Sequence, residues 1–308
     1  MRTIVVAVRG RDDVEPALDL ALDEALRRRL PLDAVHCYQL PLHGDLPSAL
    51  TPARLGASRE AAEERLRDAV SRAVARVSGA EAVGVTSHAL QGDTGRCILT
   101  RSGPAALVVV GRRGGGPLVR GVRGSVSADV LHHSSAPVVL VPERLRPTVD
   151  RWLRSRVVVA VDGTPASLAA LDWAVAQALE WGCPLVPVLV EHEEVLDPEP
   201  VLAGLSRQAV EAGGHLVQPT LLVGGTWRKL VEFVHPEDLL VLGSRGHRGP
   251  PGLIGSTSTA VGEHACCPVV VVRQGQARRE THQRSDRVRR LDVAGRSPST
   301  GTFVPRGK

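Results

Sequence analysis

A glycine-rich segment between two apolar runs occurs twice in this chain and constrains its fold more than any other feature. Residues 108–141 read VVVGRRGGGPLVRGVRGSVSADVLHHSSAPVVLV, and residues 239–272 read LLVLGSRGHRGPPGLIGSTSTAVGEHACCPVVVV. Each copy has the pattern of a strand, a glycine loop, a helix that opens at a Gly-Ser pair, and a second strand. This is a βαβ unit whose loop can hold a phosphate. The chain is therefore predicted to be an internally duplicated α/β protein.

The duplication begins well before the glycine loops. Short β-branched runs at 3–8 (TIVVAV) and 156–161 (RVVVAV) predict buried parallel strands. The first strands are offset by 153 residues but the glycine loops by only 132, so the second copy lacks about one loop and half a helix. The remaining predicted elements are helices at 15–29 and 167–181, second strands at 34–38 and 185–190, and, in the first copy alone, a Pro-rich loop at 39–55 and a helix near 57–76.

These elements predict two tandem Rossmann-like domains. Each is expected to be a five-stranded, mostly parallel sheet of order 3-2-1-4-5 with helices on both faces, because right-handed crossovers leave few alternatives. The length of 308 residues agrees with two domains. The expected boundaries are 1–143 for the first domain, 144–154 for a linker, 155–273 for the second domain and 274–308 for a disordered basic tail.

The basic character of the chain lies in that tail. It holds nine Lys or Arg residues against three Asp or Glu residues, a net +6, so the rest of the chain carries about −1 of the formal total of +5. We expect a solvated extension; contact with nucleic acid or another anionic surface is the weaker alternative. No signal peptide is recognisable and no apolar run approaches the ~18 residues of a membrane span. A cytoplasmic protein without membrane or nucleic-acid partners is expected.

The five cysteines show no CxxC spacing, so neither a zinc site nor a disulfide framework is indicated. The adjacent pair Cys266-Cys267 enters an apolar strand, and we expect two buried thiols rather than a redox pair. The histidines after the glycine loops have no partners at metal-ligand spacing, so no metal-binding residue is assigned.

The spacing of the glycines indicates where a ligand would bind. Glycines at the first two positions allow positive φ and close approach of a phosphate, and the Gly-Ser pair presents backbone N–H groups at a helix N-terminus. In an open parallel sheet the ligand lies at the carboxyl ends of strands one and four, so Arg9 and Asp162, which follow the first strands, face it. The candidate loop residues are Gly111, Gly114, Gly124 and Ser125 in the first copy and Gly243, Gly246, Gly255 and Ser256 in the second.

The first-copy spacing Gly-x2-Gly-x9-Gly-Ser resembles the ATP-binding signature of the universal stress protein family. The segments VAVDGTPASLAALDWA (159–174) and HACCPVVVVR (264–273) are similar to that family's opening and closing strands. The likeness covers residues 1–273 in two tandem copies. It implies a fold like that of the adenine nucleotide alpha hydrolases, a bound adenine nucleotide (ATP, with or without Mg²⁺), and a stress-response or regulatory role with little or no catalysis.

The resemblance also implies contacts and partners. Asp162 would lie beside the ribose and phosphates, and the backbone of Val35 and of Val188 would meet the adenine. The fifth strands, 138–141 and 269–272, are wholly apolar, and long apolar edges invite pairing. By resemblance to the family's dimers, we expect these two strands to pair with each other as an internal pseudo-dimer; a homodimer through the same strands is the alternative.

Both copies depart from the pattern. Arg9 stands where the family has Asp, although Asp12 and Asp13 follow closely. The second loop is one residue shorter, Gly-x2-Gly-x8-Gly-Ser, and Pro250-Pro251 removes two N–H donors. Because loop length decides whether the donors converge, the first copy is narrowly preferred as the nucleotide site. The alternative is that the glycines serve only tight turns.

The residues exclude several enzyme classes. There is no Gly-x4-Gly-Lys-Ser/Thr loop, and the only lysines are Lys229 and Lys308, so no P-loop NTPase is expected. There is no Gly-x-Ser-x-Gly turn and no acid–base pair, so no catalytic residue is assigned and ATP hydrolysis is at most slow. Two alternatives stay open. One is a nucleotide-free scaffold for protein–protein interactions, and the other is a related enzyme such as an ATP pyrophosphatase or an electron-transfer flavoprotein.

Four arginines lie beside the glycine loops and could either bind phosphate or be solvated. They are Arg112, Arg113, Arg245 and Arg248.

Overall fold

The computed structural model describes two similar halves, here called the first half (residues within 2–145) and the second half (within 156–276). The described segments are 2–10, 14–39, 52–112, 126–145, 156–191, 219–246 and 254–276. The candidates Gly114, Gly124 and Ser125 lie outside them, as do most of the predicted linker and tail.

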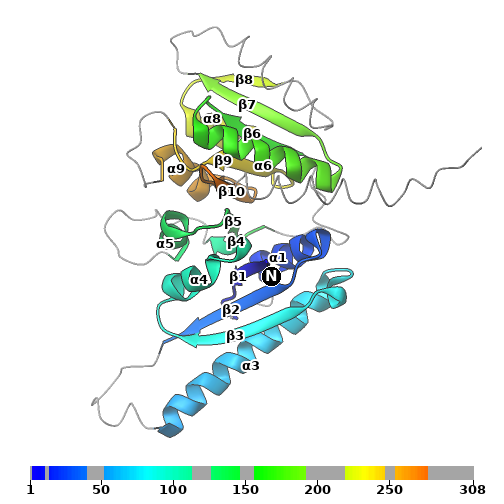
Figure 1. Ribbon diagram of the computed structural model, residues 1–308, viewed down its shortest axis with the longest axis vertical. Helices are drawn as coiled ribbons and strands as arrows, with labels where there is room; N and C mark the ends of the chain where they lie inside the picture. The colour runs from blue at the N-terminus through cyan, green and yellow to red at the C-terminus, as the bar shows by residue number, and fades with distance from the viewer. Residues whose placement is uncertain are drawn as a thin grey trace, which may run out of the picture.

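The first half alternates strands and helices as the sequence predicted (Figure 1). Its elements are β1 (Thr3–Ala7), α1 (Pro16–Arg28), β2 (Leu32–Tyr38), α3 (Pro52–Arg76), the 3₁₀ turn η1 (Ala80–Ala82), β3 (Val85–Gln91), α4 (Thr94–Ser102), β4 (Ala105–Arg112), α5 (Val126–His133) and β5 (Val138–Pro142).

The second half repeats the alternation. Its elements are β6 (Val157–Val161), α6 (Pro165–Trp181), β7 (Leu185–Glu191), β8 (Thr220–Val223), α8 (Thr226–Phe233), β9 (Leu239–Gly243), α9 (Ser256–His264) and β10 (Val269–Val272). Helix α3 begins at Pro52, within the stretch expected to be a loop, because proline is well tolerated in the first turn of a helix. No helix in the described segments is long and apolar enough to cross a membrane.

All ten strands form one sheet with the order β3-β2-β1-β4-β5-β10-β9-β6-β7-β8 (Figure 1). Each half therefore has the order 3-2-1-4-5, which confirms the predicted topology. Pairing is parallel within each half, but β5 and β10 meet antiparallel at the centre, with Val139 opposite Val270. The expectation that the two fifth strands pair with each other is confirmed, and the chain is an internal pseudo-dimer.

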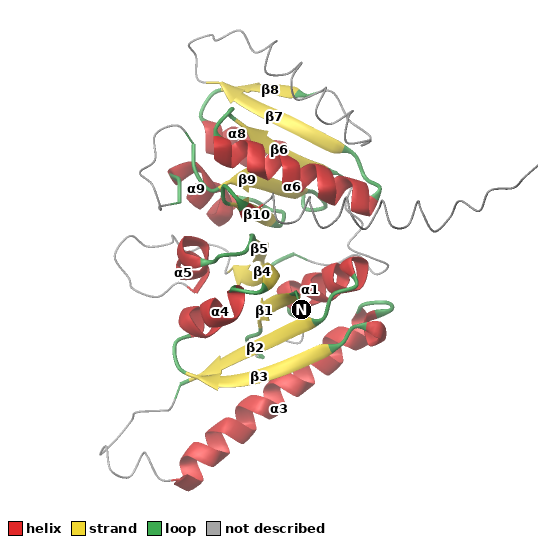
Figure 2. Ribbon diagram, viewed as in Figure 1, coloured by secondary structure: helices red, strands yellow, loops and turns green. Residues whose placement is uncertain are grey.

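Helices cover both faces of the sheet (Figure 2). Helices α1, α3 and α6 pack on one face, and α4, α5, α8 and α9 pack on the other. Successive residues of a strand point to opposite faces, so Ile4 and Val6 enter one core layer and Val5 enters the other. Burial on both faces explains why the central strands β1, β4, β5, β6, β9 and β10 contain continuous Val, Ile and Leu runs, whereas the outer strands β3 and β8 are partly exposed.

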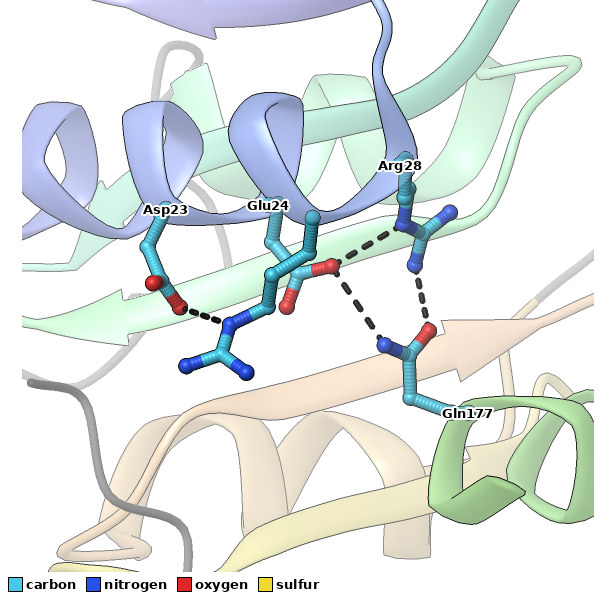
Figure 3. Close-up of polar contacts among 5 residues, drawn as sticks. Asp23, Glu24, Arg28 and Gln177 are labelled. Atoms are coloured by element: carbon cyan, nitrogen blue, oxygen red, sulfur yellow. Dashed lines mark hydrogen bonds and ion pairs between the residues drawn. The ribbon is translucent and has the colours of Figure 1, made fainter. Parts of the chain in front are cut away.

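A buried polar cluster joins α1 to α6 across the two halves (Figure 3). Arg28 donates through Nε to Glu24 at 2.9 Å and through a terminal nitrogen to the Gln177 side-chain oxygen at 2.5 Å. Gln177 in turn donates to Glu24 at 3.4 Å, and the Arg28 guanidinium lies 5.5 Å from the ring centre of Trp173. The side chains of Arg28 and Glu24 are 2% and 3% exposed, so the charges are compensated inside the protein rather than by water.

Replacing Arg28 with Ala is therefore expected to destabilise the chain by about 3–5 kcal/mol, because it leaves the Glu24 carboxylate buried without its cation. The matched control is Arg59→Ala, which breaks an ion pair of the same i,i+4 spacing with Glu63 on the exposed face of α3 and should change little. Urea unfolding of the three proteins measures the difference. Equal urea midpoints for Arg28→Ala and Arg59→Ala would contradict the stabilising role given to the buried Arg28–Glu24 pair.

Candidate functional site

The carboxyl ends of β6 and β9 bring several predicted residues of the second half together. Asp162 follows β6, and its Oδ1 accepts hydrogen bonds from the Thr164 backbone N–H at 3.0 Å and from the Thr164 hydroxyl at 2.6 Å. Thr164 caps α6, since its Oγ1 also accepts from the Ser167 N–H at 3.2 Å. The carbonyl oxygen of Arg245 lies 3.4 Å from the same hydroxyl oxygen. The N-cap of α6 thus fixes the Asp162 carboxylate beside the loop that follows β9.

The two glycines of that loop are required by close approach. A Cβ on Gly243 would lie 2.7 Å from the Ala166 carbonyl carbon and from the Ser167 nitrogen, so only glycine lets the first turn of α6 pack against the end of β9. A Cβ on Gly246 would lie 3.0 Å from Oδ2 of Asp162. The structure therefore brings Asp162 and Gly246 together, as the strand-end argument predicted.

Positive φ is not the reason for these glycines. Among the described residues of the signature, Gly111, Gly243, Gly246 and Gly255 do not have positive φ. Their role follows instead from the missing side chain. Positive φ occurs next to the site, at Gly163 (+78°) in the loop after β6 and at Gly10 (+65°) in the equivalent loop of the first half.

Helix α9 begins at this same edge of the sheet. Gly255 is its N-cap, and its N–H donates to the Ser244 carbonyl at 2.8 Å, which closes the loop. Ser258 Oγ donates to the Gly243 carbonyl at 2.8 Å and fixes the first turn of the helix against β9. Ser256, the first residue of α9, is exposed. The positive end of the helix dipole and the first-turn N–H groups therefore lie beside Asp162 and Gly246.

The second-strand valines lie one strand away from these groups. Val188 pairs with Ala160 of β6, and Val35 pairs with Ala7 of β1. Both side chains are completely buried, so only their backbone groups are available to a ligand. The Val35 carbonyl already accepts the Val8 N–H at 2.8 Å, which leaves one lone pair of that oxygen for the adenine contact that the resemblance implies.

The first-half edge differs from the second-half edge in the part that the structure describes. Arg9 forms an ion pair with Glu143 at 2.9 Å. A Cβ on Gly111 would lie 3.7 Å from the Ala17 Cβ, which is an ordinary contact. Ser127 Oγ lies 3.4 Å from the Gly111 carbonyl, a longer counterpart of the Ser258 contact. The end of β4 therefore has more room beside α1 than the end of β9 has beside α6.

Arg112, one of the arginines considered as a phosphate ligand, has a structural role. Its buried side chain crosses to the other half and donates to the carbonyls of Glu263 and Ala265, at the C-terminus of α9. Arg273 does the same in reverse, donating to Leu131 at 2.7 Å and to His132, at the C-terminal end of α5.

Burial lowers the pKa of both guanidinium groups, and the charge of Arg245 lowers the pKa of Arg273 further. No sequence pattern predicts these two contacts, because Arg112 and Arg273 do not occupy equivalent positions of the two copies. Each arginine favourably meets the negative end of a helix dipole, which ties the two halves together.

No disulfide joins the cysteines of the described segments. Burial raises the pKa of the Cys267 thiol, which is completely buried, as expected. The same expectation is wrong for Cys266, which is exposed and donates to the Val234 carbonyl at 3.3 Å. Within the described residues no three His, Cys, Asp or Glu side chains form a group that could hold a metal ion.

Comparison with known proteins agrees with this architecture. The sequence profile of the universal stress protein family matches residues 1–142 and 154–273. A universal stress protein of Mycolicibacterium smegmatis is 31% identical over 297 residues, covering 88% of this chain and 96% of its own length. One from Mycobacterium tuberculosis is 29% identical over 293 residues, covering 88% and 97%.

Among solved structures, a universal stress protein from Archaeoglobus fulgidus superposes with a TM-score of 0.66 at 19% identity, covering 89% of this chain and 96% of that one. At that identity the likeness shows the fold alone. Family membership follows from the sequence matches, which extend over both halves. The chain belongs to the universal stress protein family, as a tandem member with two copies of the family's fold joined through their fifth strands.

Proposed function

We propose that this protein binds an adenine nucleotide, ATP with or without Mg²⁺, at the carboxyl ends of β6 and β9, and that it uses the nucleotide as a regulatory ligand in a stress response. The observation that carries the proposal is the approach of Gly246 to the Asp162 carboxylate beside the N-terminus of α9. A hydrogen-bond acceptor, the Asp162 carboxylate, and the N–H donors of the first turn of α9 thus lie at the same edge of the sheet.

The two kinds of group suit different parts of a nucleotide. The Asp162 carboxylate is an acceptor suited to ribose hydroxyls or to the water shell of Mg²⁺. The first turn of α9 supplies N–H groups and a positive dipole end, which suit phosphates. Arg245, next to Gly246, adds a positive charge in the loop that joins β9 to α9. The second half is therefore the proposed site, although loop length alone favoured the first half.

Slow or absent turnover is part of the proposal. Lys229, the one lysine in the described segments, lies on α8 and pairs with Glu232 at 3.1 Å, so it is not directed at a nucleotide phosphate. Among the described residues at the Asp162 edge, no His–carboxylate pair is placed to act as a general base. The proposed role is binding, with the bound state read by a partner.

Titration of the nucleotide-stripped full chain with ATP and Mg²⁺ is expected to show saturable binding below millimolar concentration, with turnover under about 1 s⁻¹, the low end of ordinary enzyme rates. No binding up to millimolar ATP would contradict the proposal and favour a scaffold for protein–protein interactions. Faster turnover would contradict the regulatory role. A yellow purified protein would point to a flavin enzyme instead.

Two glycine variants locate the site. Gly255→Val should abolish binding, because its Cβ would lie 3.5 Å from the Arg245 Cα and the branched side chain would crowd the loop. Gly225→Val is the matched control in the same half: Gly225 is also a helix N-cap, but a Cβ there meets nothing within 4 Å. Gly124→Val, the equivalent change in the first half, should leave binding intact. Loss of binding in Gly124→Val alone would place the site in the first half.

A further inference from the structure

The first half holds one of its own carboxylates where the second half has a hydroxyl. Glu15, the N-cap of α1, is 5% exposed, and its carboxylate accepts the Arg9 N–H at 3.0 Å and the Gly10 N–H at 2.5 Å. Asp162 occupies the place of Arg9 in the second copy, and its N–H donates to the neutral Ser167 hydroxyl at 3.3 Å. Two consecutive backbone N–H groups that converge on one point form an anion-binding arrangement, and in the first half it already contains an anion.

The difference arises from the length of the first helix. Helices α1 and α6 end at equivalent residues, Arg28 and Trp181, but α1 has 13 residues and α6 has 17. One helical turn is therefore missing from the start of α1. The Glu15 side chain turns back toward the end of β1 at this place, where Gly10, one of its two donors, has a positive φ (+65°) that favours glycine.

The surrounding charges differ in the same sense. Glu143 follows β5 at the first-half edge and pairs with Arg9, whereas the equivalent residue after β10 is the neutral Gln274. The described residues of the first-half edge thus include the carboxylates of Glu15 and Glu143 and the guanidinium of Arg9, whereas Arg112, at the end of β4, is directed to the C-terminal carbonyls of α9. At the second-half edge the described charges include one carboxylate, that of Asp162, and the guanidinium of Arg245, while Arg273, like Arg112, donates to a helix C-terminus of the other half. A polyphosphate is attracted to the second edge and repelled by a buried carboxylate at the first.

We propose that Glu15 closes the first half to nucleotides, so that the duplicated chain binds one nucleotide rather than two. This inference rests on the proposed nucleotide-binding function. Glu15 acts as a built-in substitute for a ligand anion: it satisfies the N–H groups of Arg9 and Gly10, and its charge disfavours phosphate nearby. In this arrangement the N–H groups of the first half are always occupied by Glu15, and only the second half binds a nucleotide.

The stoichiometry of ATP binding to the full chain tests this directly. Calorimetric titration of the stripped wild-type protein with ATP and Mg²⁺ should give one site per chain. Two sites per chain would overturn the inference and leave the proposed function intact. Absence of binding would overturn both.

The role of Glu15 is tested in a chain whose second half is closed by Gly255→Val. Adding Glu15→Ala should restore saturable ATP binding, because two N–H donors become available and a negative charge is removed. The matched control is Glu63→Gln, which removes an exposed carboxylate from α3 in the same half and should restore nothing. Glu15→Gln covers the case in which the Ala variant does not fold, since its amide oxygen can still accept from the Arg9 and Gly10 N–H groups while the negative charge near the phosphates is removed. A folded Glu15→Gln chain that binds no better than Gly255→Val alone would overturn the inference.

Discussion

Val270→Asp is expected to unfold the whole chain or to destabilise it by more than about 4 kcal/mol, the upper end of single-substitution effects. Val270 is completely buried on β10 and lies opposite Val139 of β5, at the antiparallel junction that joins the two halves. A carboxylate there would lose its hydration without gaining a partner. Because both core layers run through this junction, the damage should reach both halves rather than one.

The matched control for this prediction is Val223→Asp. Val223 is on the outer strand β8 and is 58% exposed, so the same chemical change meets water there. Circular dichroism and urea unfolding measure both variants. A single transition that is strongly shifted in Val270→Asp and nearly unshifted in Val223→Asp is the expected result. A Val270→Asp chain in which the first half unfolds as in the wild type would contradict the continuous sheet.

Gly243→Ala and Gly111→Ala are expected to differ sharply, although the two glycines occupy the same position of the repeated signature. In Gly243→Ala the new methyl group would lie 2.7 Å from the backbone of Ala166 and Ser167, so the start of α6 must move. Overpacking of this kind costs about 1–3 kcal/mol. ATP affinity should also fall, because movement of the start of α6 displaces the Asp162 carboxylate. If that displacement costs 1.4 kcal/mol of binding free energy, the affinity falls about tenfold.

The Gly111→Ala methyl group would lie 3.7 Å from the Ala17 side chain, and the expected change in stability is within about 0.5 kcal/mol. Thermal unfolding and ATP titration of both variants provide the measurement. Equal behaviour of the two variants would show that the two edges are packed alike, against the geometry described above.

Local patterns in the sequence were sufficient to predict most of the sheet. Apolar runs located the first, second, fourth and fifth strands of each half, whereas the third strands, β3 and β8, were expected from the strand order alone. Strand β10 begins and ends at the predicted residues because Pro268 and Arg273 bound its four valines. Right-handed crossovers then determined the strand order. The β5–β10 pairing followed from two apolar edges that no element of their own half could cover, together with the family resemblance.

The site was predictable only in part. Strand ends placed Asp162 near the loop after β9, because parallel strands bring their carboxyl ends to one edge. The start of α1 was predicted to within one residue, but nothing local showed that the Glu15 side chain would turn back to Arg9 and Gly10. The exchange of Arg112 and Arg273 was missed because each contacts carbonyls more than 140 residues away in the sequence. Such contacts depend on how the halves meet, which no local pattern records.

A crystal structure of the full chain grown with saturating ATP and Mg²⁺ tests the central proposal most directly, because it shows where the nucleotide lies. We expect one nucleotide per chain, with its phosphates at the first turn of α9 near Gly255 and its ribose or metal ion at Asp162, and with Glu15 still bonded to the Arg9 and Gly10 N–H groups. Nucleotide in the first half alone, or in neither half at saturating ATP, would contradict this account.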